Sequence, residues 1–459
     1  MAQVPSGVAA VVGLGREGLS LARYLARRGF RVIAVDRKGP AELGPVLRAL
    51  ADLPVELVLG RNRAADLASA EVVFLSPGIP LDAPWVAELR AAGRRLSSLT
   101  DLFLRECPAL TVGVTGSCGK STTTALIGRI LEDTGFTAWV GGNIGRPLLD
   151  WLSLIRPGDR VVLELSSFQL ELGPPSPRVA VVLNLYPDHL DRHPSFEAYA
   201  EAKGQILARQ GPEDWAVLNA DDPVVAGFAA AAPGRVAWFG LGPPVGGPAA
   251  GLRDGRLVLR TLGGDEADLA GVGEIPLPGR HNLYNCLAAA LAAHLAGATV
   301  TSIRRVLTRF RPLPHRLEPV GEVNGVRFVN DSIATSPVRA AAGIRATAPP
   351  VVLLAGGKPK GLPLDPLVAA AREACRLVIP YGQAGPGVRA AMLAGGVPVD
   401  EVQPGLAEAF RRAVNQARPG DTVLLSPGFA SFDEFRDFEH RGEVFRRLVG
   451  QWRASNSSP

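Results

Sequence analysis

The sequence predicts an α/β protein built from parallel sheets. Short Val-, Ile- and Leu-rich runs recur along the chain, for example at 8–15, 111–116 and 160–166. Ala-, Leu- and Arg-rich stretches of helical period separate these runs. Continuous apolar strands that alternate with helices are typical of parallel sheets covered on both faces. The chain of 459 residues is too long for one ordinary core, and about 150 residues per domain predicts roughly three domains.

Charge and cysteine content exclude several classes of function. Lys and Arg number 49 against 44 Asp and Glu, so the formal net charge is only +5, and it is spread along the chain. This balance does not indicate a nucleic-acid-binding surface. The cysteines lack the C-x-x-C spacing of zinc sites, which favours a reducing cytosol without disulfides. They are Cys107, Cys118, Cys286 and Cys375.

The N-terminal residues show neither the basic region nor the cleavage pattern of a secretory leader. No uninterrupted apolar run approaches the roughly 20 residues of a membrane span. We therefore expect a soluble, cytoplasmic protein without membrane insertion.

The first strand leads into a glycine-rich turn. Gly13, Gly15 and Gly18 form a G-x-G-x-x-G pattern before a predicted helix, and Asp36 closes the next strand. Alone, this pattern favours an NAD-dependent dehydrogenase. The physical requirement is broader, because small residues let any diphosphate approach the helix N-terminus. The alternative is that the glycines only permit a tight turn and close helix packing.

A second loop, "TVGVTGSCGKSTTT" at 111–124, follows another strand and precedes a helix. Gly119, Lys120 and Ser121 fit a phosphate-binding loop, but Val114 stands where the usual spacing requires glycine. Lys120 would place a positive charge on the terminal phosphates, and the Ser121 or Thr122 hydroxyl would reach a magnesium ion. The alternative is a glycine-rich turn with an incidental surface lysine.

Three further residues downstream of this loop are candidates for chemistry. Glu164 lies within a strand, where a carboxylate beside a phosphate loop is a plausible magnesium ligand. His189 is as consistent with a hydrogen-bonded structural histidine as with a metal ligand. Lys203, on the predicted helix that begins near Phe196, is by default a solvated lysine.

Pro and polar residues interrupt the strand–helix pattern near 98 and near 312. We therefore expect domains at 1–98, 99–312 and 313–459. The Gly- and Pro-rich stretch 240–279 contains one clear strand, so we interpret it as a β-rich excursion of the middle domain.

Ordered blocks over nearly the whole chain resemble the Mur ligases of peptidoglycan synthesis. The phosphate loop of this family has the pattern G-x-x-G-x-x-G-K-S/T, which accounts for the unusual spacing of the glycines in 111–124. The resemblance implies a UDP-binding Rossmann-like domain, a central P-loop ATPase domain with a parallel sheet, and a Rossmann-like C-terminal domain for the incoming amino acid. The blocks are "GVTGSCGKSTTT", "LELSSFQLE", "NLYPDHLDRH", "GRHNLYNCLAA", "LPHRLEPV", "NDSIATSP" and "LLSPGFASFDEFRDFEHRGEVF".

Within the family, the blocks are most similar to the branch that adds glutamate to UDP-N-acetylmuramoyl-L-alanine. The resemblance implies that ATP phosphorylates the alanyl carboxylate and that the glutamate amine attacks the acyl phosphate, so that phosphate leaves a tetrahedral intermediate. Cations must offset the repulsion between the carboxylate and the γ-phosphate. The implied cofactors are ATP and two magnesium ions. The implied partners are small molecules, without nucleic acid, and we expect a monomer.

The resemblance assigns catalytic roles to Lys120, His189 and Lys203, the last as a carbamylated side chain. It implies that Ser121 and Glu164 serve one magnesium ion and that His189 and Lys203 serve the other. The implied ATP contacts are Gly116, Ser117, Cys118, Gly119, Lys120, Ser121, Thr122, Asn282, Asn285, His315, Arg316 and Asp331.

The resemblance also implies two substrate sites. The UDP-substrate contacts are Leu14, Gly15, Arg16, Glu17, Asp36, Arg37, Lys38, Ser76, Pro77, Gly78 and Asn143. The glutamate contacts are Thr335, Lys358, Lys360, Ser431, Phe432 and Phe438.

One position departs from the family pattern. D-glutamate ligases often read "NDSKAT", whereas Ile333 replaces the lysine here, as in a branch that adds L-glutamate. We expect D-glutamate from the remaining blocks, with L-glutamate as the alternative, and Lys358 or Lys360 as a substitute for the missing charge. Three competing functions are a nicotinamide oxidoreductase, a non-catalytic UDP-sugar sensor and an enzyme similar to folylpolyglutamate synthetase.

Overall fold

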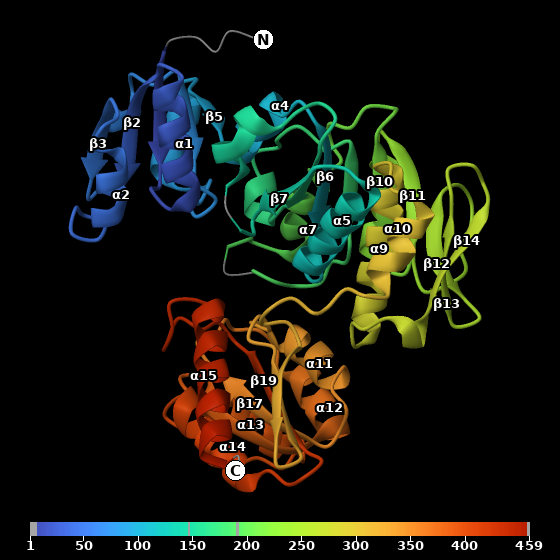
Figure 1. Cartoon of the computed structure of the whole chain (residues 1–459). Helices are drawn as coiled ribbons and strands as arrows, with labels where there is room; N and C mark the ends of the chain where they lie inside the picture. The colour runs from blue at the N-terminus through green and yellow to red at the C-terminus, as the bar shows by residue number, and fades with distance from the viewer. Residues whose placement is uncertain (1–6, 146, 190–191, 457–459) are drawn as a thin grey trace. The chain divides into compact units, whose positions relative to one another are not determined.

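The computed structural model describes residues 7–145, 147–189 and 192–456 (Figure 1). This part of the chain divides into two compact units. The first unit runs to Ala270 and includes Asn285–Val306, and the second holds Gly271–Tyr284 and the described residues from Leu307 onward. Residues 1–6, which contributed to the expectation of no leader segment, lie outside the described residues.

The first unit begins with a parallel sheet in the order β3-β2-β1-β4-β5. The strand order reverses between β1 and β4, which is where open α/β sheets bind ligands beyond the carboxyl ends of their strands. Helix α1 packs against β1 and β2. The elements are β1 (Val8–Val12), α1 (Arg16–Arg27), β2 (Arg31–Asp36), α2 (Gly44–Leu50), β3 (Val55–Leu59), η1 (Ala64–Leu67), β4 (Val72–Leu75), α3 (Pro84–Ala91) and β5 (Arg95–Ser97).

The second sheet of this unit has the order β14-β13-β12-β11-β10-β9-β6-β8-β7. Its strands from β7 to β12 pair in parallel. The Val- and Leu-rich strands β6, β8, β9 and β10 are almost wholly buried. The elements before β9 are α4 (Leu99–Glu106), β6 (Leu110–Thr115), α5 (Lys120–Thr134), β7 (Ala138–Gly142), η2 (Leu148–Leu154), β8 (Arg160–Glu164) and α6 (Ser167–Leu170). The remaining elements before β12 are β9 (Val179–Val182), α7 (Phe196–Gly204), β10 (Trp215–Asn219), α8 (Pro223–Gly227), η3 (Phe228–Ala231) and β11 (Arg235–Phe239).

The Gly- and Pro-rich stretch 240–279 contains more strand than its composition predicts. It forms β12 (Ala249–Arg253), β13 (Arg256–Arg260) and β14 (Glu266–Gly271), where we expected one clear strand. Asp254 and Gly255 join the antiparallel β12 and β13, and both have positive φ, of 50° and 71°. An Asp-Gly pair suits the tight hairpin turns whose twist matches that of the strands. Beyond β14 lie η4 (Val272–Glu274), α9 (Arg280–Leu295) and α10 (Val300–Leu307).

The two sheets of the first unit share one hydrophobic core, although the sequence predicts a boundary near residue 98. Leu21 and Leu25 of α1 belong to the same buried cluster as Phe103 of α4 and Leu148 of η2. Helix α1 also packs directly against α4 and η2. The N-terminal sheet therefore joins the central sheet in one compact unit.

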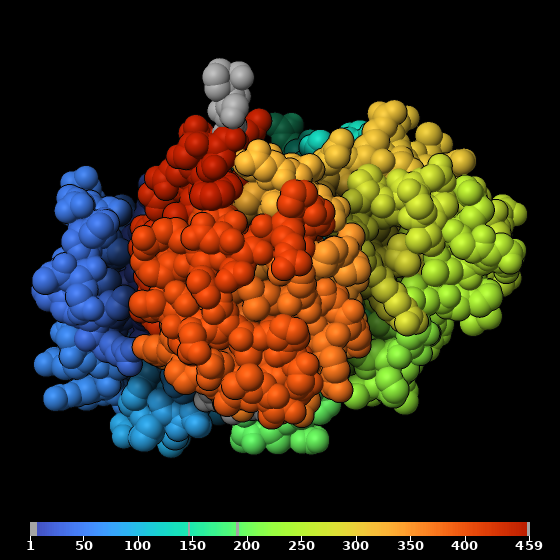
Figure 2. All heavy atoms as spheres, turned by 90° about the horizontal axis from the view of Figure 1, so that it is seen from below, coloured from blue at the N-terminus to red at the C-terminus, as the bar shows by residue number. Residues whose placement is uncertain are grey.

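The second unit contains a sheet in the order β15-β16-β19-β17-β18. Strand β15 is antiparallel to β16, and the other pairs are parallel. Buried clusters cover both faces of this sheet, and Figure 2 shows the unit in orange and red as closely packed side chains. The elements are β15 (Glu318–Val323), β16 (Val326–Asn330), α11 (Pro337–Arg345), β17 (Val351–Gly356), α12 (Asp365–Ala374), β18 (Cys375–Tyr381), α13 (Gly385–Ala394), α14 (Leu406–Gln416), β19 (Thr422–Gly428) and α15 (Phe438–Asn456).

These sheets confirm the predicted α/β class. Among the described helices, none combines the length and apolar composition that a bilayer span requires.

Candidate functional site

The phosphate loop connects the carboxyl end of β6 to the N-terminus of α5. Gly116 and Gly119 have positive φ, of 144° and 85°, which side-chain-bearing residues rarely adopt. A Cβ at Gly119 would lie 2.1 Å from Asn285 Oδ1, so the loop packs closely against α9. Glycine is therefore required at both positions of the loop. The glycines leave backbone N–H groups and a helix N-terminus at the sheet edge, which is an anion-binding arrangement.

Lys120 folds back over this loop. Its Nζ donates to Gly116 O at 2.8 Å and to Ser117 O at 3.4 Å. The ammonium thus lies beside the carbonyl groups that frame the loop, within reach of an anion bound there.

A carboxylate at the end of β8 meets the first turn of α5. Ser121 Oγ donates to Glu164 Oε2, and Asn143 Nδ2 donates to Glu164 Oε1 at 2.9 Å. Glu164 is buried, with 3% of its surface exposed. Because β6 and β8 are adjacent parallel strands, their carboxyl ends place these side chains together. Carboxylate, hydroxyl and amide oxygens are the donors that magnesium prefers, so the set fits that ion.

Lys203 is buried, although its helix predicted a solvated lysine. Only 2% of its surface is exposed. Its Nζ donates to Thr115 Oγ1 at 3.3 Å and lies 4.9 Å from the centre of the Tyr199 ring. Ser195 caps the N-terminus of α7 and thereby fixes the helix that carries Lys203. The side chain consequently points to the end of β6, next to the phosphate loop.

His189 adopts a left-handed backbone conformation with φ of 55°. Its ring meets the edge of Phe168, with centroids 5.2 Å apart, and Nε2 lies 3.8 Å from Asp188 Oδ2. Phe168 also stacks on His193 and accepts the guanidinium of Arg192 over its face. In residues 7–145, 147–189 and 192–456, no group of three or more His, Cys, Asp and Glu side chains forms a metal-binding cluster.

The glycine-rich turn after β1 is ordered by Asp36. Its carboxylate accepts the N–H of Leu14 at 2.7 Å and that of Lys38 at 2.8 Å. A Cβ at Gly18 would meet Gly13 O at 1.8 Å, so the pattern requires glycine there. Asp36 is 9% exposed. Its carboxylate therefore organises the backbone of the turn after β1.

The turn after β1 also contacts the central sheet. Gln169 Nε2 donates to Glu17 Oε1 at 2.8 Å, and Arg16 Nη1 donates to Gly145 O at 3.3 Å. Burial raises the pKa of Glu17, while the Gln169 hydrogen bond and the charge of Arg16 oppose that rise. Glu17 therefore faces α6 of the central sheet. Among the other predicted residues of this sheet, Ser76 Oγ donates to Gly13 O at 2.8 Å.

The second unit has a pocket of about 220 Å³ at the carboxyl ends of β17 and β19. Lys360 and Gln383 supply its polar lining, and Pro337 and Phe429 are among its apolar lining residues. Lys358 lies outside this lining, because its backbone pairs with Ala430 and its side chain is exposed. Of these two lysines, Lys360 lines the pocket.

The other predicted glutamate contacts of the second unit differ in exposure. Ser431 is 2% exposed, whereas Phe432 is 67% exposed and Thr335 is half-buried. Phe438 is the first residue of α15, and its ring lies against the His315 ring with centroids 6.3 Å apart.

Among the predicted ATP contacts, Asn282 of α9 donates through Nδ2 to Pro278 O at 2.7 Å.

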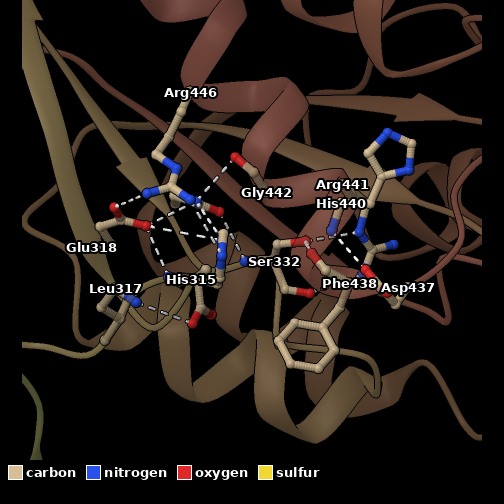
Figure 3. A network of polar contacts seen from close by, with 12 residues as sticks. His315, Leu317, Glu318, Ser332, Asp437, Phe438, His440, Arg441, Gly442 and Arg446 are labelled. Atoms are coloured by element: carbon tan, nitrogen blue, oxygen red, sulfur yellow. Dashed lines mark hydrogen bonds and ion pairs between the residues drawn. The ribbon is translucent and has the colours of Figure 1, made fainter. Parts of the chain in front are cut away.

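His315 lies in a hydrogen-bonded network (Figure 3). Asn330 Nδ2 lies 3.1 Å from His315 Nδ1. The backbone N–H of His315 donates to Glu318 Oε2 at 2.8 Å. Burial, followed by the charge of Arg446, lowers the pKa of His315, which favours the neutral imidazole. A Cβ at Gly442 would lie 2.1 Å from His315 Nδ1, so glycine is required where α15 passes the ring.

Asn184, which we did not predict as a site residue, contacts the phosphate loop. Its side chain accepts the N–H of Cys118 at 2.9 Å and donates to Cys118 O at 3.2 Å. It holds the phosphate loop from the end of β9. The sequence carried a signal for Asn184, because a polar residue directly after an apolar strand lies at the sheet edge. Glu164, at the end of β8, follows the same pattern. Gln169, which joins the turn after β1 to α6, was also missed, although Ser166 and Gln169 have the spacing of a helix capping box.

Comparison with protein families gives matches to each of the three sheets. Residues 8–98 match the Mur ligase MurD-like N-terminal domain, 114–293 the Mur ligase middle domain, and 315–429 the Mur ligase glutamate ligase domain. Curated relatives align over nearly the whole chain. The UDP-N-acetylmuramoylalanine–D-glutamate ligase of Symbiobacterium thermophilum is 46% identical, covering 96% of this chain and 97% of the relative. The ligase of the same name from Geobacter metallireducens is 40% identical, covering 96% of each.

Solved structures with the same fold are more distant in sequence. A pseudomurein peptide ligase type C from Methanothermus fervidus aligns with a TM-score of 0.60 at 19% identity, over 97% of this chain and 100% of that one. The UDP-N-acetylmuramate-alanine ligase MurC from Thermotoga maritima aligns with a TM-score of 0.60 at 18% identity, over 98% and 99%.

Proposed function

Because this chain belongs to the Mur ligase family, we propose that it joins D-glutamate to UDP-N-acetylmuramoyl-L-alanine with conversion of ATP to ADP and phosphate. The observation that carries the proposal is the meeting of Lys120, Ser121 and Glu164 at the carboxyl ends of β6 and β8. This arrangement suits a nucleoside triphosphate with magnesium. A UDP-sugar sensor would not need it, and an NAD-dependent oxidoreductase would leave it unused.

The UDP end of the substrate would bind at the carboxyl edge of the first sheet. The turn from Leu14 to Glu17, with Asp36, Arg37 and Lys38, would face the uridine and diphosphate, and Ser76–Gly78 would border them. Arg16 and Lys38 bring positive charge to a diphosphate there. Since Asp36 accepts two backbone N–H groups, its part is to keep the turn open for the ligand. Asn143, held by Glu164, would contact the muramoyl group.

Lys120 and the loop N–H groups would carry the phosphoryl transfer. An oxygen of the alanyl carboxylate attacks the γ-phosphorus, and the bond from that phosphorus to the ADP oxygen breaks. Both reactants are anionic, so the reaction needs positive charge between them. The Lys120 ammonium, now bonded to Gly116 O and Ser117 O, would turn to the β- and γ-phosphates. Asn282 and Asn285 of α9 would face the adenine, and His315, Arg316 and Asp331 would serve the nucleotide from the second unit.

Magnesium would supply further charge neutralisation in this site. Ser121 and Glu164 would hold one ion, and His189 with Lys203 would hold a second. A buried ammonium such as that of Lys203 is costly beside a cation. We propose that the neutral Lys203 amine adds to carbon dioxide, forming an N–C bond and releasing a proton. The resulting carbamate is anionic, which suits a metal ligand and a buried position facing Thr115 Oγ1.

Glutamate would bind in the second unit, near the pocket that Lys360 lines. Its amine attacks the acyl carbon, phosphate departs, and the nitrogen loses a proton to form the amide. Thr335, Ser431, Phe432 and Phe438 would surround it, with Lys358 at the pocket's margin. The curated relatives named as D-glutamate ligases favour the D isomer. Ile333 favours the L isomer as a second candidate, because it removes a cation that many D-glutamate ligases carry.

The test is phosphate release with saturating UDP-N-acetylmuramoyl-L-alanine, ATP and either glutamate enantiomer. We expect a preference for D-glutamate of about 10⁴-fold, because the wrong isomer leaves buried polar groups unpaired. A preference for L-glutamate would overturn the stereochemical assignment and keep the ligase chemistry. Comparable rates with both isomers would contradict a rigid carboxylate-reading pocket. No phosphate release with either isomer would contradict the function itself.

We further propose a cytoplasmic monomer with domains at 1–98, 99–312 and 313–459. Strand β5 ends at Ser97, and β15 begins at Glu318, which supports boundaries near these positions. Light scattering after size exclusion tests the monomer, for which we expect a mass near 48.2 kDa.

A further inference from the structure

Arg441, in the first turn of α15, is the largest fully buried side chain of the described residues. Its exposed fraction is 0%, and its five hydrogen bonds all go to neutral oxygens of the protein. A buried charge without an ionised partner at hydrogen-bonding distance is unfavourable for folding. The position of Arg441 therefore needs an explanation other than stability.

The guanidinium of Arg441 joins two segments of the second unit. Nε donates to Ser332 Oγ at 3.0 Å, and Nη2 donates to Ser332 O at 2.9 Å (Figure 3). Nη1 and Nη2 each donate to Phe429 O at 3.1 Å, and Nη1 also lies 3.5 Å from Ala430 O. Ser332 Oγ in turn donates to Phe438 O at 2.8 Å, at the start of α15. Ser332 follows β16 and Phe429 follows β19, so one planar group holds the carboxyl ends of two adjacent parallel strands.

These two segments border the proposed glutamate site. Phe429 lines the pocket of the second unit, and Ser431 lies two residues further along the chain. Thr335 lies three residues after Ser332. The five hydrogen bonds of Arg441 match the five N–H groups of a guanidinium, so none is left for a substrate carboxylate. Arg441 can therefore act on glutamate only through the segments that it holds.

The end of a third strand encloses the guanidinium. Gly357 directly follows β17 and has φ of 129°. A Cβ at Gly357 would lie 2.2 Å from Ala430 O and 3.1 Å from Arg441 Nη1, so glycine is required there. The next residue, Lys358, donates its N–H to Ala430 O at 2.8 Å and accepts the Ala430 N–H at 3.2 Å. The carboxyl ends of β16, β19 and β17, which are neighbours in the sheet, thus meet around Arg441.

We propose that Arg441 is a positioning residue of the glutamate site, which sets the spacing between the segments 332–335 and 429–431. The inference rests on the proposed function, which places Thr335 and Ser431 beside glutamate. In that reaction, phosphoryl transfer to the alanyl carboxylate comes before the attack of the glutamate amine. Loss of Arg441 therefore impairs amide formation and leaves phosphoryl transfer in place.

The predicted ATP contact next to Ser332 has bonds of its own. Asp331 accepts the Ser426 hydroxyl at 2.8 Å and the Leu317 N–H at 3.2 Å. Neither bond involves Arg441. We therefore expect the KM for ATP to change by no more than about threefold when Arg441 is replaced.

Lysine and methionine at position 441 separate the fork of donors from the charge. Lysine keeps the positive charge but has a single donor atom, which cannot hold both Ser332 and Phe429. Methionine keeps an apolar stem and removes the charge. We expect both variants to raise the KM for the preferred glutamate isomer at least about tenfold, because small misplacements of binding groups are costly. A KM within about twofold of wild type in Arg441→Lys would overturn the proposal, since charge alone would then be sufficient.

Positional isotope exchange of the β,γ-bridging oxygen of ATP reports phosphoryl transfer in the absence of glutamate. With UDP-N-acetylmuramoyl-L-alanine present, the label scrambles each time the γ-phosphoryl group moves to the alanyl carboxylate and returns to ADP. We expect Arg441→Lys to keep this exchange within about threefold of wild type. A parallel loss of isotope exchange and amide formation would overturn the proposal, because Arg441 would then support the whole site.

Ser332→Ala tests the same contact without changing the arginine, and it decides the question if neither variant of Arg441 folds. Alanine removes the acceptor of Arg441 Nε and the hydroxyl that donates to Phe438 O. We expect the KM for glutamate to rise about threefold to tenfold, with the KM for ATP unchanged. An unchanged KM for glutamate in a folded Ser332→Ala protein would overturn the proposal.

Arg376 of β18 provides a matched control in the same unit. Its guanidinium donates to Asp421 Oδ2 at 2.6 Å and to Gln416 O at 2.8 Å. Asp421 precedes β19 and Arg376 is the second residue of β18, so these contacts lie at the opposite ends of the strands from Arg441. Arg376→Met should lower stability without changing the KM for glutamate. A rise of about tenfold in that KM would show that loss of any arginine of this sheet disturbs the site, and would overturn the specific role of Arg441.

Amide hydrogen exchange gives a readout that does not depend on ligase activity. In Arg441→Lys, peptides covering 331–336 and 428–435 should exchange faster than in wild type, and Arg376→Met should leave them protected. Unchanged exchange in Arg441→Lys would refute the anchor even in an active ligase. Faster exchange of these peptides in a protein without ligase activity would support the anchor and refute only the proposed function.

Discussion

Replacing Asp331 with asparagine should change how the stability of the second unit depends on pH. Burial raises the pKa of Asp331 from its ordinary value of 3.8 to about 7, although Ser426, Leu317, Arg316 and Arg339 each favour the ionised form. Desolvation of the carboxylate is thus the largest effect. Asparagine keeps the hydrogen-bonding geometry and removes the ionisation.

The sign follows from proton binding in the two states. Between about pH 4 and pH 7 the folded protein keeps the Asp331 proton and the unfolded chain has lost it, so stability falls as pH rises. The contribution is fully present below about pH 4 and is lost as pH rises through about 7. A difference of about 3 pKa units corresponds to roughly 4 kcal/mol, as an upper limit. The stability of Asp331→Asn relative to wild type should therefore increase by about 2–4 kcal/mol from pH 4 to pH 8.

Urea titrations at pH 4, 5, 6 and 8 measure this difference, with unfolding followed by hydrogen exchange in peptides of β16 and β19. These strands report on the second unit itself. Every other titrating group is common to both proteins and cancels in the comparison. A difference that is constant with pH would refute a buried, desolvated carboxylate. A difference that decreases with pH would show that Arg316 and Arg339 stabilise the ion more than burial destabilises it.

Three further substitutions test the first unit. Lys120→Ala should abolish ADP formation while the melting temperature stays within about 2 °C, because its bonds to loop carbonyls add little stability; near-normal turnover would contradict the ATP site. Lys203→Ala should be nearly inactive and partly rescued by acetate, which replaces the carbamate; an unmodified Lys203 in the active enzyme, detected by crystallography, would exclude that role. Gln169→Leu leaves the half-buried Glu17 carboxylate without its donor and should destabilise by about 1–3 kcal/mol in urea titration, whereas an unchanged midpoint would show that Glu17 finds water instead.

Local sequence pattern is enough to predict the α/β architecture and the strand and helix on either side of the phosphate loop. Parallel sheets, the strand–loop–helix around Lys120 and the carboxylate at 164 all follow from it, because strand burial and glycine-rich turns leave signals within a few residues. The Mur ligase resemblance read from short blocks is confirmed by relatives of 40–46% identity. The excursion at 240–279 was recognised as β-rich, but its strands were undercounted, since composition hides short antiparallel strands between glycines.

Packing between distant segments sets which of these polar side chains are enclosed. Lys203 lies on a helix whose sequence permits solvation, and it is buried because Thr115 and Tyr199 lie over it. Asp331 contacts Ser426, which lies 95 residues later in the chain, and packs against α11. The N-terminal sheet shares its core with the central sheet through α1. Burial depends on contacts between segments that are far apart in the chain, and the local pattern of a segment carries no record of what will cover it.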